Sequence, residues 1–486
     1  MLNLISIKNT NFILISLYIL CNAVMIYFEF FQLLFLPFVF ILIYLFIYHL
    51  DIVFLLIVFC TPLSFNFEDL ALGGIGFYFP TEPLLFIFTL FFLMKLIYKK
   101  TLKNNLSHYR HPITKVIILQ LLWLTITSIT SELPIVSFKF LLARTWFIVP
   151  IFFYAIHFFN EGKQRIFQFL WCFVIPVFIV SAYTLINHYS HSFSEEAGHW
   201  VMWPFFKDHT SYGAILAICI PIVLFLINET KKLSLKYLLI IILFVLLFAL
   251  YFSYTRAAWL SILGAGLVYL LIYYRIKLKW IISLALVSSF FIFLNFNSLS
   301  YLAEKNDAEH TTENFSERLE SMSNISSDAS NLERLNRWSC AIELFKKKPL
   351  LGWGPGTYSF VYAPFQSSKD LTIISTNFGD GGNAHSEYLG PLAEQGLIGM
   401  IIMLILVITV FYSLGKFYIN SLNFFERRLT MMVILSLSTY FSHGILNNYL
   451  DTDKASIPVW GLIAIFVVLS TYSIPSEKKL ERIKNK

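Results

Sequence analysis

The chain has 486 residues, of which 57% are hydrophobic, 18% are aromatic and only 13% are charged. Ordinary globular domains are about 45–50% apolar and about 25% charged. So few charges cannot cover so many apolar side chains, which excludes a soluble multidomain enzyme and a disordered chain. The formal net charge of +7 could suggest nucleic acid, but the basic residues lie in short loops between apolar runs. We therefore expect the lipid bilayer as a partner and no nucleic acid.

Apolar runs long enough to cross a bilayer recur along the chain. A helix needs about 20 residues to cross a hydrocarbon core of about 30 Å. The candidate spans are residues 12–28, 30–49, 52–64, 82–98, 113–130, 140–158, 166–187, 210–228, 236–253, 257–274, 280–296, 396–414, 430–446 and 457–473. The sequence predicts an all-α polytopic membrane protein with about 12–14 spans. The run at 52–64 is short and contains Pro62, so a re-entrant segment is the alternative there.

The distribution of lysine and arginine predicts the orientation of these spans. If fourteen spans alternate from a cytoplasmic N-terminus, 23 basic residues fall in the inner segments and four fall in the short outer ones. The four are Lys139, Lys207, Arg256 and Lys454. Because cytoplasmic loops carry the excess of positive charge, we expect a multi-pass protein with both termini in the cytoplasm.

One long hydrophilic segment, residues 297–395, is predicted to lie on the outer side. It separates a transmembrane bundle of about eleven spans at 1–296 from three further spans at 396–473, which a basic tail at 474–486 follows. The part before the amphipathic helix described next is predicted to be a solvated linker. From Leu332 onward Leu335, Trp338, Ile342 and Phe345 recur at helical spacing, which predicts an amphipathic helix in a small folded cap that ends near Lys346 to Pro349.

Glycines at 352, 354 and 356 follow this helix. The stretch lacks the lysine of a phosphate-binding P-loop and follows no strand. It predicts a turn in which two backbone segments approach closely.

Four arginines near the outer side are candidates for binding an anion. Arg256 lies in a tight turn between two spans, and Arg144 lies a little over one turn into a span. Either could be a snorkelling side chain that orients its helix. Arg334 shares a helical face with Trp338, whereas Arg337 points elsewhere. A guanidinium binds phosphate oxygens bidentately; the alternative for Arg334 and Arg337 is the exposed face of an amphipathic helix.

His385 is the candidate general base. It ends the outer segment, stands two residues before Glu387 and directly precedes a span. A histidine can take a proton from a hydroxyl near neutral pH, although a structural role at the start of the helix is the alternative. Asp208 and His209 precede another span on the same side and are second-rank candidates.

No metal site and no cofactor are predicted. Four of the five cysteines lie in apolar runs, and no CxxC pair occurs. Asp451-Thr452-Asp453 has the spacing of the metal-binding pair of nucleotide-sugar transferases, but it is predicted to lie outside, where nucleotide sugars are absent.

The order of these motifs resembles the O-antigen ligase and O-antigen polymerase superfamily. The resemblance rests on Arg334-x-x-x-Trp338-x-x-Ala341, on Lys348 to Gly356, on His385 to Leu389 and on Glu394 to Gly399, with the earlier pair Thr255-Arg256. It covers about residues 200–470. The resemblance implies a GT-C-like protein of the bacterial inner membrane whose large loop is periplasmic. It also implies that Arg256 and Arg334 bind a diphosphate and that His385 is essential. Ser386 stands where many members have asparagine.

The implied function is transfer of a glycan from an undecaprenyl diphosphate carrier to an acceptor hydroxyl on the periplasmic face, with inversion and without a metal. His385 would act as the base, supported by Glu387. Lipid A-core as acceptor would make the protein an O-antigen ligase, and a second lipid-linked glycan would make it a polymerase. A transporter is the alternative from another class, but it would place its ionisable residues near the membrane midplane.

Overall fold

The computed structural model describes residues 16–66, 78–99, 106–276, 329–366 and 382–484. The chain divides into two units, Met1–Leu56 and Ile57–Lys486. The described part of the first unit holds an apolar helix at Ser16–Tyr27, the 3₁₀ helix η1 (Gln32–Phe35), α2 (Leu36–Tyr48) and the start of α3 (Leu50–Cys60). Within it, the Tyr18 hydroxyl donates to the Leu33 carbonyl oxygen at 3.0 Å.

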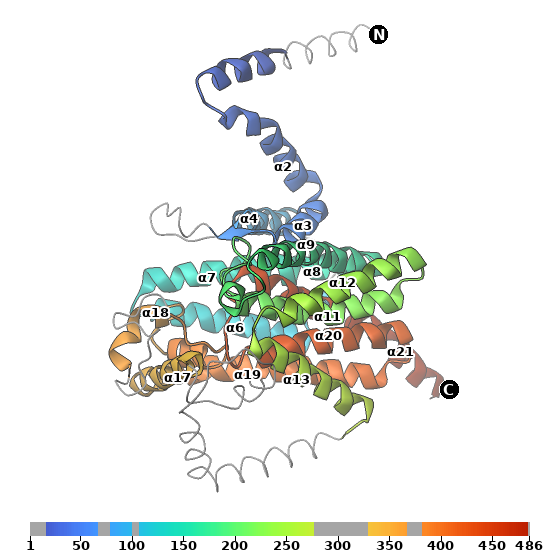
Figure 1. Cartoon of the computed structure of the whole chain (residues 1–486). Coiled ribbons are helices and arrows are strands. Elements are labelled where there is room, and N and C mark those ends of the chain that lie inside the picture. The colour runs from blue at the N-terminus through green and yellow to red at the C-terminus, as the bar shows by residue number, and fades with distance from the viewer. Residues whose placement is uncertain (1–15, 67–77, 100–105, 277–328, 367–381, 485–486) are drawn as a thin grey trace. The chain divides into compact units, whose positions relative to one another are not determined.

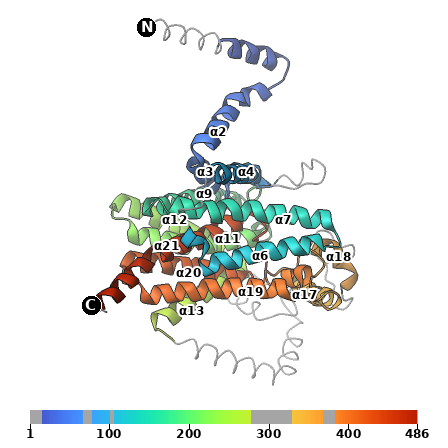
Figure 2. The ribbon, with the colours of Figure 1, turned by 180° about the vertical axis from the view of Figure 1, so that it is seen from behind.

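The second unit is a bundle of long helices that run side by side (Figures 1 and 2). Its elements are β1 (Phe65–Asn66), β2 (Tyr78–Phe79), α4 (Thr81–Lys99), α5 (Leu106–Tyr109), α6 (Pro112–Ile129), α7 (Pro134–Ile148), the π-helix η4 (Val149–Tyr154), α8 (Ala155–Phe159), α9 (Lys163–Ser190), α10 (Glu195–Gly198), α11 (His209–Glu229), α12 (Leu233–Tyr251), α13 (Arg256–Tyr273), α17 (Ala329–Lys347), α18 (Tyr358–Val361), η5 (Ala363–Phe365), α19 (Leu389–Asn420), α20 (Phe424–His443) and α21 (Asp453–Lys484). The two short strands pair antiparallel, with Phe65 opposite Phe79.

The helices have the length and composition of membrane spans. Nine helices of the described residues can cross a membrane by these criteria, or ten if the bent pair Leu33–Tyr48 and Leu50–Cys60 is one span. The protein is thus an all-α polytopic membrane protein, as predicted. The predicted span at 430–446 corresponds to α20, which is not among these nine helices. Its first turn is charged at residues 426–428. The predicted span at 280–296 and the linker before residue 329 lie outside the described residues.

Helices α11 and α21 form the centre of the bundle. In their apolar windows 78% and 89% of the residues are buried. Helix α11 packs against α20, α12 and α13. A Cβ atom at Gly213 would lie 2.8 Å from the Thr255 side chain, so glycine at this position lets α11 approach the turn before α13.

Helices α17 and α18 lie at one end of the bundle in both views, and the C-terminal end of α21 lies at the other (Figures 1 and 2). We call the first the loop end; the N-terminal residues of α11, α13, α19 and α21 and the C-terminal residue of α20, His443, mark it. All the candidate residues of the sequence analysis except Arg144, which lies within α7, sit in or next to this end.

Helix α17 exists where it was predicted, but the face it buries differs from the prediction. Cys340, Ala341 and Leu344 pack against residues of α18, α19 and the loop before α19, whereas Leu335 and Ile342 are 36% and 42% exposed. The small side chains at 340 and 341 allow close packing against α19, and this contact outweighs the burial of the larger apolar side chains.

The glycine-rich turn after α17 lies against a break in α19. The Gly396 backbone is not helical, with φ +72°, and the backbone N–H of Gly354 donates to the Glu394 carbonyl oxygen at 2.8 Å. A Cβ atom at Gly352 would lie 2.3 Å from the Glu394 backbone, and one at Gly396 would lie 2.2 Å from the Leu350 carbonyl oxygen. The predicted close approach of two backbone segments is confirmed.

Candidate functional site

The start of α11 is tied to two neighbouring segments at the loop end. Asp208 caps the helix, since its carboxylate accepts from the Ser211 backbone N–H at 2.7 Å. The Thr210 hydroxyl contacts both Asp208 and the Tyr449 hydroxyl. The Thr255 hydroxyl donates to the His209 carbonyl oxygen at 2.7 Å. These contacts join α11 to the turn before α13 and to the loop between α20 and α21.

His385 is held in a strained loop directly before α19. Its φ is +47°, a region that non-glycine residues rarely adopt. Its backbone N–H donates to the Asn383 side-chain oxygen at 3.0 Å, and its carbonyl oxygen accepts from the Trp338 indole at 3.4 Å. Because residues in such conformations cluster at functional sites, the geometry supports a functional role for His385.

The His385 ring contacts a residue that the sequence analysis did not select. Its side chain hydrogen-bonds Asn447, and the Asn447 amide nitrogen lies 3.0 Å from Nε2 of His443. Asn447 and His443 are 2% and 1% exposed. A buried polar row therefore runs from His385 through Asn447 to the end of α20.

Arg334 is one of two arginines whose charge acts on this cluster; the other is Arg337. Arg334 is half-buried on α17, and its charge acts on the ionisation of His209, His385 and His443. It also acts on the Tyr449 hydroxyl. Arg334 thus lies at the meeting point of α11, the His385 loop, the end of α20 and the loop that follows it.

Burial and charge set the protonation state of His385. Burial lowers the pKa of His385 to about 4, and the positive charges of Arg337 and Arg334 add to this effect. The hydrogen bond with Asn447 and the charge of Glu333 oppose it. The ring is therefore neutral at pH 7 and can accept a proton, as a general base must.

Arg256 is the first residue of α13 and is half-buried. It directly follows Thr255, whose hydroxyl contacts the His209 carbonyl oxygen. Arg256 therefore begins α13 next to the start of α11.

Glu387 lies beside His385 in the sequence, but its carboxylate holds the loop between α20 and α21. One oxygen accepts from the Tyr440 hydroxyl at 2.5 Å and from the backbone N–H groups of Tyr449 at 2.7 Å and Leu450 at 2.9 Å. The Glu387 backbone N–H donates to Gly444 at 2.8 Å. Burial raises the pKa of Glu387. These contacts describe a structural link.

Arg144 and Arg337 both contact acidic residues and backbone carbonyls. Arg144 forms an ion pair with Asp451 and donates to the Leu450 carbonyl oxygen at 3.1 Å. Arg337 donates to Glu333 at 2.6 Å and to the Asn383 carbonyl oxygen at 3.2 Å. Arg337 thereby fixes the loop that carries His385.

A cavity of about 250 Å³ lies next to this loop. Its lining includes Arg144, Tyr358, Asn383, Glu387 and Asn448. These aromatic and polar groups suit a sugar ring, but the lining holds the neighbours of His385 at 383, 384 and 386 and does not include His385, Arg334 or Arg256.

Asp451 and Asp453 do not share a site. Asp451 pairs with Arg144, whereas the buried Asp453 accepts from the Ser64 hydroxyl at 2.8 Å. In the part of the chain that the structure describes, no group of three or more His, Cys, Asp or Glu side chains is placed to hold a metal ion.

In a comparison with family models, residues 241–404 match the family described as O-antigen ligase. We call residues 241–404 the O-antigen ligase-like segment. The match confirms the resemblance to the O-antigen ligase and polymerase superfamily. The O-antigen ligase-like segment includes Arg256, Arg334 and His385 and ends within α19.

An uncharacterized protein of Haemophilus influenzae is 22% identical over 136 residues. The alignment covers 28% of this chain and 33% of the relative, so the chain matches about a third of that protein's length.

Part of the site lies outside the O-antigen ligase-like segment. His209 and Asp208 precede it, and His443, Asn447 and Tyr449 follow it. Asn447 and Tyr449 were not predicted. The only hint in the sequence was the position of His443 and Asp451 on either side of them at the end of a span.

Proposed function

We propose that this protein is a membrane glycosyltransferase that moves a glycan from an undecaprenyl diphosphate carrier to an acceptor hydroxyl on the periplasmic face. The observation that carries the proposal is the pairing of a permanent cation, Arg334, with a neutral imidazole, His385, at the loop end. An O-antigen ligase-type glycosyltransferase needs both groups, one to hold a diphosphate and one to accept a proton.

The reaction is a single displacement at the anomeric carbon. The acceptor oxygen forms a bond to this carbon while the bond to the diphosphate oxygen breaks, and the diphosphate leaves with the electron pair. Arg334 and Arg256 stabilise the growing negative charge. The hydroxyl proton passes to the His385 ring, and the configuration inverts.

Binding of the donor would also activate the base. The positive charges of Arg337 and Arg334 lower the pKa of His385. A diphosphate bound at Arg334 offsets this charge, so the pKa of His385 rises and the ring becomes a stronger base. The base is therefore strongest when the donor is in place. In this scheme Asn447 orients the ring, and Glu387 holds the surrounding loop.

The test is a transfer assay with the purified full chain in lipid nanodiscs. Undecaprenyl diphosphate-linked glycan is supplied with either lipid A-core or a second lipid-linked glycan, and the products are resolved on a gel. A product on lipid A-core identifies a ligase, and a longer lipid-linked glycan identifies a polymerase. His385→Ala should abolish the product while its thermal unfolding stays unchanged, with His191→Ala as the control on an exposed histidine. Transport of the intact donor with no new glycosidic bond would contradict the proposal.

A further inference from the structure

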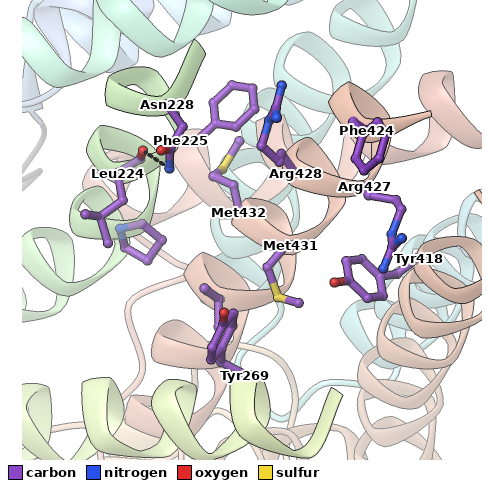
Figure 3. Close-up of a pocket in the computed structure, with 12 residues that line it drawn as sticks. Leu224, Phe225, Asn228, Tyr269, Tyr418, Phe424, Arg427, Arg428, Met431 and Met432 are labelled. Atoms are coloured by element: carbon purple, nitrogen blue, oxygen red, sulfur yellow. Dashed lines mark hydrogen bonds between the residues drawn. The ribbon is translucent and has the colours of Figure 1, made fainter. Parts of the chain in front are cut away.

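A second pocket, of about 420 Å³, lies at the end of the bundle opposite the loop end. It is formed by the last turns of α11, α13 and α19 and the first turns of α20 (Figure 3). None of the residues discussed for glycan transfer lines it, so its function is separate from the proposed reaction.

Two arginines line this pocket, and they differ in their partners. Arg428 forms an ion pair with Glu229 at 2.5 Å. The Arg427 guanidinium lies over the Tyr418 ring, 4.9 Å from its centroid, and within the described residues it has no carboxylate at ion-pair distance. Figure 3 shows Arg427 and Tyr418 side by side. The pocket therefore has a net positive charge.

The other residues that line the pocket are mostly apolar, and some of them are exposed on the outside of the bundle. Met431 and Met432 line it and are buried, whereas Leu224 and Tyr269 line it and are 42% and 41% exposed. Leu224 and Tyr269 belong to helices that can cross the membrane, so their exposed surfaces face lipid. A soluble anion could bind Arg427 but would not contact the apolar lining. A lipid with an anionic head group could contact both.

We propose that this pocket binds one anionic glycerophospholipid, with its phosphate at Arg427 and an acyl chain along Leu224 and Met432. The basic residues at the same end, including Lys231 and Lys232 after α11, place it in the cytoplasmic leaflet by the positive-inside rule. Basic pockets between helices on this side select anionic head groups.

The test is native mass spectrometry of the purified full chain, titrated with phosphatidylglycerol and with phosphatidylcholine of the same acyl chains. We expect one phosphatidylglycerol to stay bound in preference to phosphatidylcholine. Loss of a charge-assisted contact should weaken its apparent affinity about tenfold in Arg427→Gln. Leu224→Trp should weaken it by filling the groove, and because Leu224 is exposed this substitution does not disturb the core.

Matched controls exist for both variants. The Arg165 guanidinium also lies 4.9 Å from an aromatic centroid, that of Phe158, and Leu247 is also 42% exposed; neither lines the pocket. Arg165→Gln and Leu247→Trp should bind phosphatidylglycerol as the parent protein does. Equal retention of both lipids, unchanged binding in both pocket variants, or equal stabilisation of the protein by free glycerol phosphate would overturn the proposal.

Discussion

The indole N–H of Trp338 donates to the carbonyl oxygen of His385 at 3.4 Å. Trp338 lies one helical turn after Arg334 on α17, so this contact links the helix that carries Arg334 to the loop that carries the proposed base. The position of Arg334 relative to His385 therefore depends on the docking of α17.

Trp338→Phe should keep the packing of the ring and remove only this hydrogen bond. A bond of this kind contributes about 0.5–1.5 kcal/mol, so we expect kcat to fall about two- to tenfold while the thermal unfolding temperature changes little. Steady-state kinetics and a melting curve measure both effects. An unchanged kcat would show that the contact does not position His385.

Arg334→Lys and Arg256→Lys keep the charge but lose the planar guanidinium that, in the proposed mechanism, binds two phosphate oxygens. Hydrogen bonds to charged groups contribute about 1.5–3 kcal/mol, so kcat/KM should fall about 10- to 100-fold in each variant. Arg165→Lys, at the opposite end of the bundle, should match the parent protein. Near-normal transfer by both site variants would argue against the diphosphate clamp.

The pH dependence of kcat/KM should reflect the low pKa of His385. In the proposed mechanism the neutral ring is the active form, so activity should persist as the pH falls from 7 to 5 and decline as it approaches about 4. Arg337→Gln removes a cation that lowers this pKa, which should shift the decline to higher pH. Arg337 also fixes the loop that carries His385, so a lower rate in Arg337→Gln would not by itself test the electrostatic effect. The measurement is therefore the pH at which kcat/KM declines. A decline at the same pH in both proteins would contradict the electrostatic assignment.

Glu387 can be tested by comparing two substitutions. Glu387→Gln keeps an oxygen that can accept from Tyr440, Tyr449 and Leu450, so kcat/KM should stay within about threefold of the parent value. Glu387→Ala leaves all three donors without this acceptor and should lower the free energy of unfolding by about 3 kcal/mol. Loss of activity in a stable Glu387→Gln protein would instead show that the carboxylate takes part in the chemistry.

A chelator should leave the transfer rate of the purified protein unchanged, because in the proposed mechanism arginines take the role that a divalent cation would have at the diphosphate. Rates measured with EDTA and after addition of Mg²⁺ check this. Inhibition that Mg²⁺ reverses would contradict the metal-independent mechanism.

Local patterns in the sequence predicted the features that depend on near neighbours. Apolar runs predicted the membrane helices, and the glycines at 352 and 354 predicted a close backbone turn. Helical spacing alone did not predict which face of α17 is buried, because that depends on the shape of α18 and α19. The sequence alone also could not predict the roles of residues that are far apart in the chain but in contact in the structure. Asn447 becomes significant only because the chain brings it to His385, and Glu387 binds the α20–α21 loop instead of its neighbour in sequence.

The fit between the turn at 352–356 and the break in α19 bears on the biogenesis of the protein. The turn is synthesised before its partner, and the Gly354 N–H has no Glu394 carbonyl to meet until α19 has left the ribosome. Asn447 comes later still. The helices can enter the membrane one after another, but the loop end is completed only after Asn447 has been translated, so premature termination in α20 would yield an inserted protein with an incomplete candidate site.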